Sequence, residues 1–292
     1  MKLLSVGEII WDVFGESYSL GGAPLNLAAH AALQGCDVWL ASAVGHDELG
    51  DRALDEIRAL GIATEYVSIL DGAVTGQCLV TLDENGVPSY NVLTGVAYEH
   101  IGLPDESAQA FDAIAFGTLA LHSAHNRRTM EEFLSRHAFA EVYTDLNIRP
   151  PFYSVESIEQ CLSHATIVKI SDEELPTVTE TLWGETLAPR EAAVRIVARY
   201  PQIRLLLITC GADGSTCYDF SEGKTYECAA EPASVVSTVG AGDSFGATFL
   251  ACYMKTKDIP LALRRASQVS AFVVSRQGAV PDDIKPFLSA LA

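Results

Sequence analysis

Short apolar runs alternate with amphipathic helical patterns along most of the chain, and this alternation constrains the fold more than any other feature. Buried runs of roughly 4–8 residues suit strands of a parallel sheet that is covered by helices on both faces. We expect strands at Leu3–Val6, Val38–Ala43, Ile114–Phe116, Val142–Asp145, Ile167–Ile170 and Leu205–Thr209. We expect helices at Leu25–Gly35, Asp47–Leu60, Arg127–Ala138, Ser154–His164, Pro189–Tyr200, Pro260–Arg276 and Asp283–Leu291. The pattern predicts one α/β domain, residues 1–292, with a doubly wound, mostly parallel sheet flanked by helices.

One stretch departs from this alternation and predicts a second, smaller sheet. The dipeptide Asn85-Gly86 is the strongest short signal for a β-hairpin, and the strand-like runs Gln77–Asp83 and Ser89–Leu93 flank it. Together with Ile9–Leu20, this hairpin is expected to form a small antiparallel sheet that projects from the main body. A projecting sheet beside a parallel-sheet enzyme is suited to act as a lid, which we assign to residues 9–20 and 76–94.

Charge and cysteine content exclude several classes of partner. The formal net charge is −19, and an acidic surface repels nucleic acids and anionic membranes. The seven cysteines are odd in number and include no C-x-x-C pair, which is typical of reduced thiols in a cytoplasmic protein. No apolar stretch approaches the roughly 20 residues of a membrane span. We therefore expect a cytoplasmic protein with small-molecule partners, no nucleic acid and no membrane.

A glycine-rich turn at residues 238–246 (TVGAGDSFG) opens a predicted helix that runs to about Met254. Because Gly240, Ala241 and Gly242 carry no bulky side chains, their backbone N–H groups can point into one cavity at the positive end of the helix. That position suits the charge that develops on a transferring phosphoryl group. The turn is therefore a candidate anion hole.

Asp243 follows this turn directly, where a carboxylate would repel bound phosphate unless it had a task. The obvious task is to take the proton from an attacking hydroxyl, as kinases do with an aspartate. Two other readings stay open: Asp243 could be a favourable acid in the first turn of a helix, or the glycines could be a dinucleotide-binding loop. The glycine spacing is one residue too long for that loop, and no βαβ unit follows it.

Several segments, in order along nearly the whole chain, resemble the motifs of the ribokinase-like carbohydrate kinases, the phosphofructokinase B group. Besides the turn, the matching segments are Gly21–Asn26 (GGAPLN), Val44–Gly50 (VGHDELG), Thr144–Arg149 (TDLNIR), Lys169–Glu174 (KISDEE) and Thr209–Gly214 (TCGADG). The resemblance implies an ATP-dependent sugar kinase that uses Mg²⁺, with Asp243 as the catalytic base and Gly240, Ala241 and Gly242 as the anion hole. Within the group, the chain looks most like the fructokinases.

The resemblance also assigns residues to the two substrates, and Gln77 is added because a predicted lid strand could bring it to the sugar. The candidate substrate-binding residues are Asp12, Gly22, Asn26, Gln77, Asn147 and Arg149. The candidate ATP-binding residues are Lys169, Ser171, Glu174, Thr209, Gly211, Gly214 and Ser267, and Glu174 is expected to place Mg²⁺ through water. Ordinary structural roles remain open for these residues: Asp12 could end a strand, Asn26 could cap a helix and Gln77 could face outward.

Three positions depart from the pattern of the group. Ser237 stands where many members have an aspartate that binds a monovalent cation, which puts activation by K⁺ in doubt. Ser171 replaces the asparagine of the N-x-x-E motif, so the Mg²⁺ network is expected to differ. Ser267 stands where several members place an asparagine beside the adenine.

The distribution of basic residues bears on the substrate. No Lys or Arg occurs from Leu3 to Asp51 or from Ala59 to Asn126, and these stretches contain the expected sugar site and lid. A site for a sugar phosphate should supply cations, whereas Asp12 and Asn26 suit neutral hydroxyls. We therefore expect a neutral monosaccharide as substrate, and specifically fructose converted to fructose 6-phosphate, unless another part of the fold supplies a cation.

Three other functions remain open on the sequence. The chain could be a related kinase for ribose, a nucleoside or a 2-keto-3-deoxy sugar acid. It could be a non-catalytic sugar sensor on the same fold, or a nucleotide-dependent oxidoreductase. An exposed edge of the lid could pair with another subunit, which suggests a homodimer.

Overall fold

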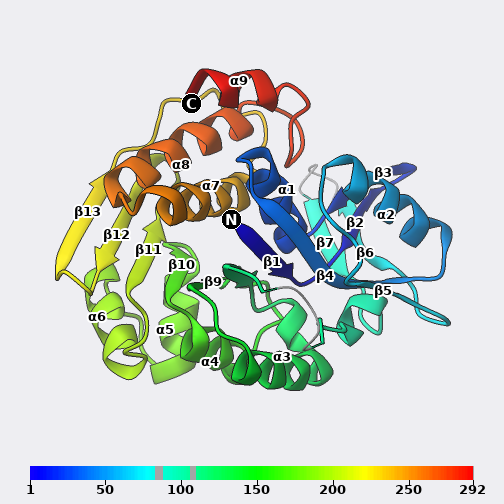
Figure 1. Ribbon diagram of the computed structural model, residues 1–292, viewed down its shortest axis with the longest axis horizontal. Coiled ribbons are helices and arrows are strands. Elements are labelled where there is room, and N and C mark those ends of the chain that lie inside the picture. The colour runs from blue at the N-terminus through cyan, green and yellow to red at the C-terminus, as the bar shows by residue number, and fades with distance from the viewer. Residues whose placement is uncertain (83–87, 106–109, 292) are drawn as a thin grey trace.

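The computed structural model describes residues 1–82, 88–105 and 110–291, and Figure 1 shows the arrangement of its elements. Within these ranges a nine-stranded sheet has the order β13-β12-β11-β10-β9-β8-β1-β4-β5. All strands are parallel from β11 to β5, and β12 and β13 continue as an antiparallel hairpin. Its strands are β1 (Lys2–Val6), β4 (Asp37–Gly45), β5 (Val67–Leu70), β8 (Ala113–Phe116), β9 (Glu141–Asp145), β10 (Ile167–Ser171), β11 (Leu205–Thr209), β12 (Ser215–Asp219) and β13 (Lys224–Cys228).

Helices cover both faces of this sheet, which confirms the predicted doubly wound architecture (Figure 1). One face is buried under α1 (Ala23–Leu33), α2 (Glu48–Ala59), α7 (Ala241–Thr256) and α8 (Ile259–Val274). The other is buried under α3 (Ala124–Arg136), α4 (Val155–His164), α5 (Leu175–Trp183) and α6 (Pro189–Arg199). The remaining helix α9 (Ile284–Leu291) packs on α8, and short 3₁₀ turns occur at η1 (Ala97–His100), η2 (Ala120–His122) and η3 (Gly211–Asp213).

The predicted strands of the parallel sheet are all present, because each is buried on both faces and is therefore mostly apolar in sequence. Among the strands and α-helices of the described chain, β5 and α5 were not predicted. The edge strand β5 is only partly buried, so its hydrophobic pattern is weak. Helix α5 is short and begins with a proline at its second position, which hides its periodicity in the sequence.

A second sheet lies beside the parallel one and has the order β3-β2-β6-β7, with β2 (Ile10–Phe14), β3 (Ser17–Gly21), β6 (Gly76–Leu82) and β7 (Pro88–Val92). It contains the segments that we predicted for the lid. The pairs β2–β3 and β6–β7 are antiparallel, as expected, but β2 and β6 pair in parallel, so the sheet is mixed rather than antiparallel. The predicted turn at Asn85-Gly86 lies outside the described residues.

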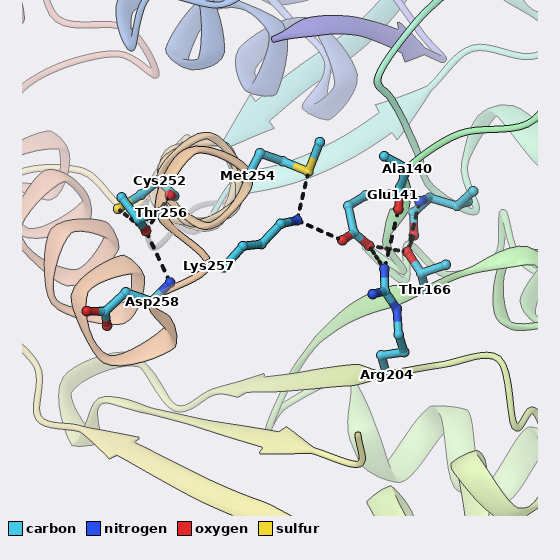
Figure 2. A network of polar contacts seen from close by, with 10 residues as sticks. Ala140, Glu141, Thr166, Arg204, Cys252, Met254, Thr256, Lys257 and Asp258 are labelled. Atoms are coloured by element: carbon cyan, nitrogen blue, oxygen red, sulfur yellow. Dashed lines mark hydrogen bonds and ion pairs between the residues drawn. The ribbon is translucent and has the colours of Figure 1, made fainter. Parts of the chain in front are cut away.

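A buried carboxylate ties together three segments at the amino end of β9 (Figure 2). Glu141 is 1 % exposed, and its Oε2 accepts hydrogen bonds from Arg204 Nη2 and Thr166 Oγ1, each at 2.6 Å. Its Oε1 lies 3.3 Å from Nζ of Lys257, in the turn between α7 and α8. These contacts attach the C-terminal end of α7 to the sheet, and Asp243 lies at the opposite, N-terminal end of that helix.

Within the described ranges, no helix combines the length and hydropathy needed to cross a membrane. All seven cysteines are free thiols, as the sequence predicted.

Candidate active site

The polar side chains with the most unusual surroundings gather at the carboxyl ends of β1, β8 and β9. In an open α/β sheet, ligands bind in the crevice at this edge. A cavity lies here between the sheet and the first turns of α1 and α7. Its lining includes Glu8, Asp145, Asn147 and Asp243, together with Ser5, Ala23, Pro24, Leu27, Ala115, Phe116, Gly117, Thr118 and Leu119.

Asp243 lies in the first turn of α7 and is held by Asn26 of α1. The Asn26 Nδ2 donates a hydrogen bond of 2.8 Å to Asp243 Oδ2. Burial raises the pKa of Asp243, although this hydrogen bond and the positive charges of Lys169 and Arg149 lower it. Among the described residues no group hydrogen-bonds to Oδ1 of Asp243, which lines the cavity, and a free carboxylate oxygen is what a general base requires.

The glycine turn before Asp243 has the geometry of a helix N-terminus. Gly240 is the N-cap residue of α7 and has a left-handed φ of 77°, which a side chain would strain. The Ala241 N–H donates to Thr238 O at 3.2 Å and closes the turn itself. The N–H groups of Gly242 and Asp243 donate to no carbonyl of the described residues, so they are the donors that the turn offers to an anion.

A buried ion pair in the parallel sheet lies next to this turn. Lys169 of β10 lies 2.8 Å from Asp145 Oδ2 of β9, and the Lys169 side chain is 5 % exposed. A Cβ added to Gly242 would lie 3.2 Å from Lys169 Nζ, so the ammonium group reaches the candidate anion hole. Burial lowers the pKa of Lys169, but the carboxylates of Asp145 and Glu174 outweigh it and the net shift is upward. Lys169 is therefore charged.

Asp145 was not placed in the site by sequence reasoning, although it ends a predicted strand at this edge. Burial raises its pKa to about 6, even though Lys169 lowers it. Its Oδ1 is buried and has no hydrogen-bond partner in the described part of the chain. A buried carboxylate oxygen without a partner marks a place where a ligand, water or ion can bind.

Glu174 joins two loops rather than pointing freely into the cavity. Its Oε1 accepts from the Ile148 N–H at 2.7 Å, and its Oε2 accepts from the Ser171 N–H at 2.9 Å. The Ser171 Oγ accepts in return from the Glu174 N–H at 3.2 Å. Glu174 thereby fixes the loop of Asn147, whose φ of 42° is left-handed.

No cluster of three or more His, Cys, Asp or Glu side chains in the described ranges could hold a metal ion by itself. Mg²⁺ typically uses one or two carboxylates and completes its coordination with waters and substrate phosphates. The unpartnered Oδ1 of Asp145 and the nearby Glu174 fit this mode of binding.

On the lid side, Asp12 of β2 is half-buried and lies within electrostatic reach of Arg149. It lies opposite Cys78 of β6 in register, and burial raises the pKa of Asp12 although the nearby thiol of Cys78 lowers it. Gln77 lies opposite Trp11, so its side chain is on the other face of the lid sheet from Asp12. Asp12 therefore lies on the face of the lid sheet that is within reach of the charge of Arg149, and Gln77 lies on the opposite face.

A glycine is required at position 22 because the backbone there passes very close to the backbone of Glu8. Its φ is 116°, and a Cβ there would lie 2.4 Å from the carbonyl oxygen of Glu8. Glu8 follows β1, is 3 % exposed and lines the cavity, but sequence reasoning did not place it in the site. Burial raises the pKa of Glu8 to about 7, and the charge of Asp243 adds to this rise. An acidic residue two positions after a buried strand was the signal available in the sequence.

Arg149 brings a positive charge to this acidic region. It is exposed, yet its charge lowers the pKa values of Glu8, Asp12 and Asp243. The stretches Leu3 to Asp51 and Ala59 to Asn126 contain no Lys or Arg, but Arg149, in the loop after β9, brings a positive charge close to the first of them.

The remaining candidates lie around β11 and α8. Thr209 ends β11 beside Ser171 in register, so the candidate nucleotide residues share one edge. Gly211 and Gly214 form the tight turn after β11, and a Cβ on Gly214 would lie 2.2 Å from Cys228 O. Ser267 accepts from the Glu231 N–H at 3.1 Å and so anchors the segment that crosses α8.

Ser237 belongs to the strip that leads into the glycine turn. Its Oγ accepts a hydrogen bond from the Val239 N–H at 3.3 Å. Val235, Val236 and Val239 are all more than half exposed, which is unusual for valine and leaves an apolar surface beside the turn.

Comparisons with known proteins identify the family. Residues 3–285 of the chain match the sequence model of a family described as "pfkB family carbohydrate kinase". The chain belongs to the pfkB family of carbohydrate kinases. This finding sets aside the oxidoreductase that the glycine spacing had left open, and it confirms the family predicted from the motifs.

Members of the pfkB family that resemble this chain differ in their substrates. The chain is 28 % identical to a probable fructokinase-4 of Arabidopsis thaliana over 94 % of its own length and 87 % of the relative. It is 25 % identical to a 2-dehydro-3-deoxygluconokinase of Haemophilus influenzae, covering 97 % and 96 % of the two chains. A fructokinase of Xylella fastidiosa with bound ATP has the same fold, with a TM-score of 0.80, 24 % identity, and coverage of 95 % and 93 %.

Proposed function

We propose that this pfkB-family protein transfers the γ-phosphoryl group of ATP to a hydroxyl of a neutral monosaccharide, with fructose as the substrate and fructose 6-phosphate as the product. The observation that carries the proposal is the pair formed by Asn26 and Asp243 at the start of α7, beside the cavity. The similarity to the Arabidopsis thaliana and Xylella fastidiosa fructokinases supports the choice of sugar.

In this reaction Asp243 takes the proton of the attacking hydroxyl with Oδ1 while Asn26 holds Oδ2. The N–H groups of Gly242 and Asp243 and the charge of Lys169 stabilise the negative charge on the transferring group. Thr209, Gly211, Gly214 and Ser267 shape the nucleotide side. Bound Mg²⁺, held near Asp145 and Glu174, would neutralise phosphate charge. Closure of the sheet β3-β2-β6-β7 would exclude water from the phosphoryl group.

A neutral substrate agrees with the charge around the cavity. Glu8, Asp12 and Asp243 all lie within electrostatic reach of Arg149, so this single guanidinium is already balanced by carboxylates. A phosphorylated sugar would add two negative charges to a region of net negative charge. Asp12, whose raised pKa reflects burial, suits hydroxyl groups as an acceptor.

A 2-keto-3-deoxy sugar acid is the second candidate, and Arg149 is the observation that favours it. One carboxylate on the substrate could pair with this guanidinium. The relative from Haemophilus influenzae that acts on 2-dehydro-3-deoxygluconate, by its name, matches nearly the whole chain. A non-catalytic sugar sensor is the third, and the intact Asn26–Asp243 pair argues against it.

The test is consumption of ATP with Mg²⁺ in the presence of fructose, ribose, glucose, adenosine, 2-keto-3-deoxygluconate or fructose 6-phosphate, for the wild type and Asp243→Asn. We expect turnover on fructose and a loss of about 10²–10⁴ in kcat for the variant, the usual size of a general-base effect. Turnover only on the sugar acid would replace fructose but keep the kinase. Sugar binding without turnover on any compound would favour the sensor.

Two further properties are part of the proposal. The seven free thiols support a cytoplasmic location. The exposed rings of Phe14 and Tyr18, at 49 % and 40 %, support a homodimer formed through the lid. Light scattering of the purified protein at micromolar concentration decides between a monomer and a dimer.

A further inference from the structure

Three polar residues form a stripe along one side of α1. Asn26, His30 and Gln34 are spaced by four residues, so they lie one above another on the same helix face. Asn26 donates to Asp243 of α7, and Gln34 Nε2 donates to Thr248 Oγ1 of α7 at 3.3 Å. The two ends of the stripe therefore bind the same helix, which sets how α7 lies against α1.

His30, in the middle of the stripe, makes a different contact. It is fully buried, and its Nε2 lies 2.8 Å from the carbonyl oxygen of Ala279. Ala279 belongs to the segment between α8 and α9. Because a carbonyl can only accept, Nε2 must carry the proton. Nδ1 is buried without a partner in the described chain, and burial lowers the pKa of His30, so the ring is neutral.

Ala279 in turn lies directly against the glycine turn. A Cβ built on Gly240 would be 2.6 Å from Ala279 Cα and 2.9 Å from Ala279 O. Gly240 therefore has no freedom to move toward Ala279, and its left-handed backbone is held between that residue and the first turn of α7. His30 thus contacts Ala279, and Ala279 in turn contacts Gly240.

We propose that His30 is a positioning residue for phosphoryl transfer: by holding Ala279 against Gly240, it fixes the direction of the N–H groups in the turn that follows. One helix, α1, then positions both chemical parts of the site. Asn26 holds the base, and His30, one turn later, holds the turn that faces the phosphoryl group. The expected effect on catalysis rests on the proposed kinase function, whereas the effect of His30 on the position of the glycine turn does not.

The first experiment measures amide hydrogen exchange of residues 238–244 by mass spectrometry in the complete protein without substrates. His30→Leu keeps an apolar side chain of similar size but removes the donor, and it should exchange faster in this segment. His137→Leu is the matched control, because in the described ranges the His137 ring hydrogen-bonds to Phe133 O in the last turn of α3, the helix that ends just before it, and to no other group. Unchanged exchange of residues 238–244 in a folded His30→Leu protein would overturn the proposal.

The second experiment measures turnover. We expect kcat of His30→Leu to fall about 10–100-fold, the scale of a misplaced catalytic group, with the KM for sugar nearly unchanged. His30→Gln should recover most of the loss, because its amide N–H can donate to Ala279 O. Equal losses in the Leu and Gln variants, or a rise in the KM for sugar alone, would refute the assignment.

A spectroscopic measurement covers the case in which His30→Leu does not fold. In the wild type, long-range ¹H–¹⁵N correlation at neutral pH should show a His30 ring that is uncharged and protonated at Nε2, because burial lowers the pKa of His30. A His30 ring that titrates with the ordinary value of about 6.5, or that is protonated at Nδ1, contradicts the proposal. If the wild type phosphorylates no sugar, the proposed function fails, while the exchange and spectroscopic results still decide the role of His30.

Discussion

Asn26 and Asp243 are 217 positions apart in the chain, yet the Asn26 amide donates a 2.8 Å hydrogen bond to the Asp243 carboxylate. Asn26 belongs to the helix that follows the lid strand β3, and Asp243 belongs to the helix that follows the hairpin β12–β13. The contact joins the part of the fold that carries the candidate sugar site to the part that carries the candidate nucleotide site.

Removal of the Asn26 donor should change the pH profile. This hydrogen bond lowers the pKa of Asp243, so Asn26→Ala should raise that pKa and move the acid limb of kcat/KM to higher pH. A base acts only when ionised, so activity at low pH falls most. The control is Gln34→Ala, which loses a contact with α7 away from the base. An acid limb that stays in place would contradict the role assigned to Asn26.

Glu8 should make stability fall as pH rises. Its pKa is about 7 in the folded protein and 4.5 without burial, so the folded state binds the extra proton between these values. The contribution of the neutral acid is complete below pH 4.5 and is lost as pH rises through 7. Denaturant unfolding at pH 5 and pH 8 should show a larger loss for the wild type than for Glu8→Gln, up to about 3 kcal/mol. Glu16→Gln, on an exposed turn, should behave like the wild type.

Breaking the buried ion pair should be costly. Lys169→Met leaves the Asp145 carboxylate buried without its cation, and we expect the free energy of unfolding to fall by about 3–5 kcal/mol at pH 8. The double variant Lys169→Met with Asp145→Leu should recover part of this loss, because no unpaired charge remains. A double variant with the full sum of both single losses would show that the pair itself is not the source of the effect.

Gly246→Ala tests how tightly α7 packs against Tyr143 near the candidate base Asp243. A Cβ at Gly246, one turn after Asp243, would lie 2.2 Å from the Tyr143 hydroxyl. Overpacking of this kind costs about 1–3 kcal/mol. The Tyr143 hydroxyl has no partner among the described residues, so Tyr143→Phe should relieve the clash at little cost. The prediction fails if the double variant is no more stable than Gly246→Ala.

Glu141 should matter for stability but not for chemistry. Glu141→Leu removes the buried acceptor of Arg204, Thr166 and Lys257, and we expect a loss of about 2 kcal/mol or more, since a buried network is broken. Because the network lies at the amino end of β9, away from Asp145, kcat at low temperature should remain near the wild-type value. A large fall in kcat with unchanged stability would contradict this separation.

The sequence predicted the parallel strands well because they are buried on both faces and are mostly apolar in sequence. It did not predict the parallel pairing of β2 with β6, since hairpin signals such as Asn85-Gly86 are local and say nothing of pairing between distant segments. The face of Gln77 depends on that register, and a shift of one residue turns every side chain to the other face.

The motif order predicted Asp243 and Asn26, but it did not reveal that they touch. Glu8, Asp145 and His30 escaped because an acid after a strand or a histidine in a helix has many ordinary roles. Their significance comes from burial and from neighbours distant in sequence: Asp243 for Glu8, Lys169 for Asp145, and Ala279 for His30. Only the folded chain brings these groups together.

The parallel pairing of β2 with β6 means that the small sheet is not a transferable module. Its two hairpins leave the main body at separate places, and each supplies one of the two central strands. Grafting one hairpin from another kinase would present a foreign edge to a native strand, with no assurance of matching register. An engineer who wishes to exchange substrate preference through this sheet must replace residues 10–21 and 76–92 together.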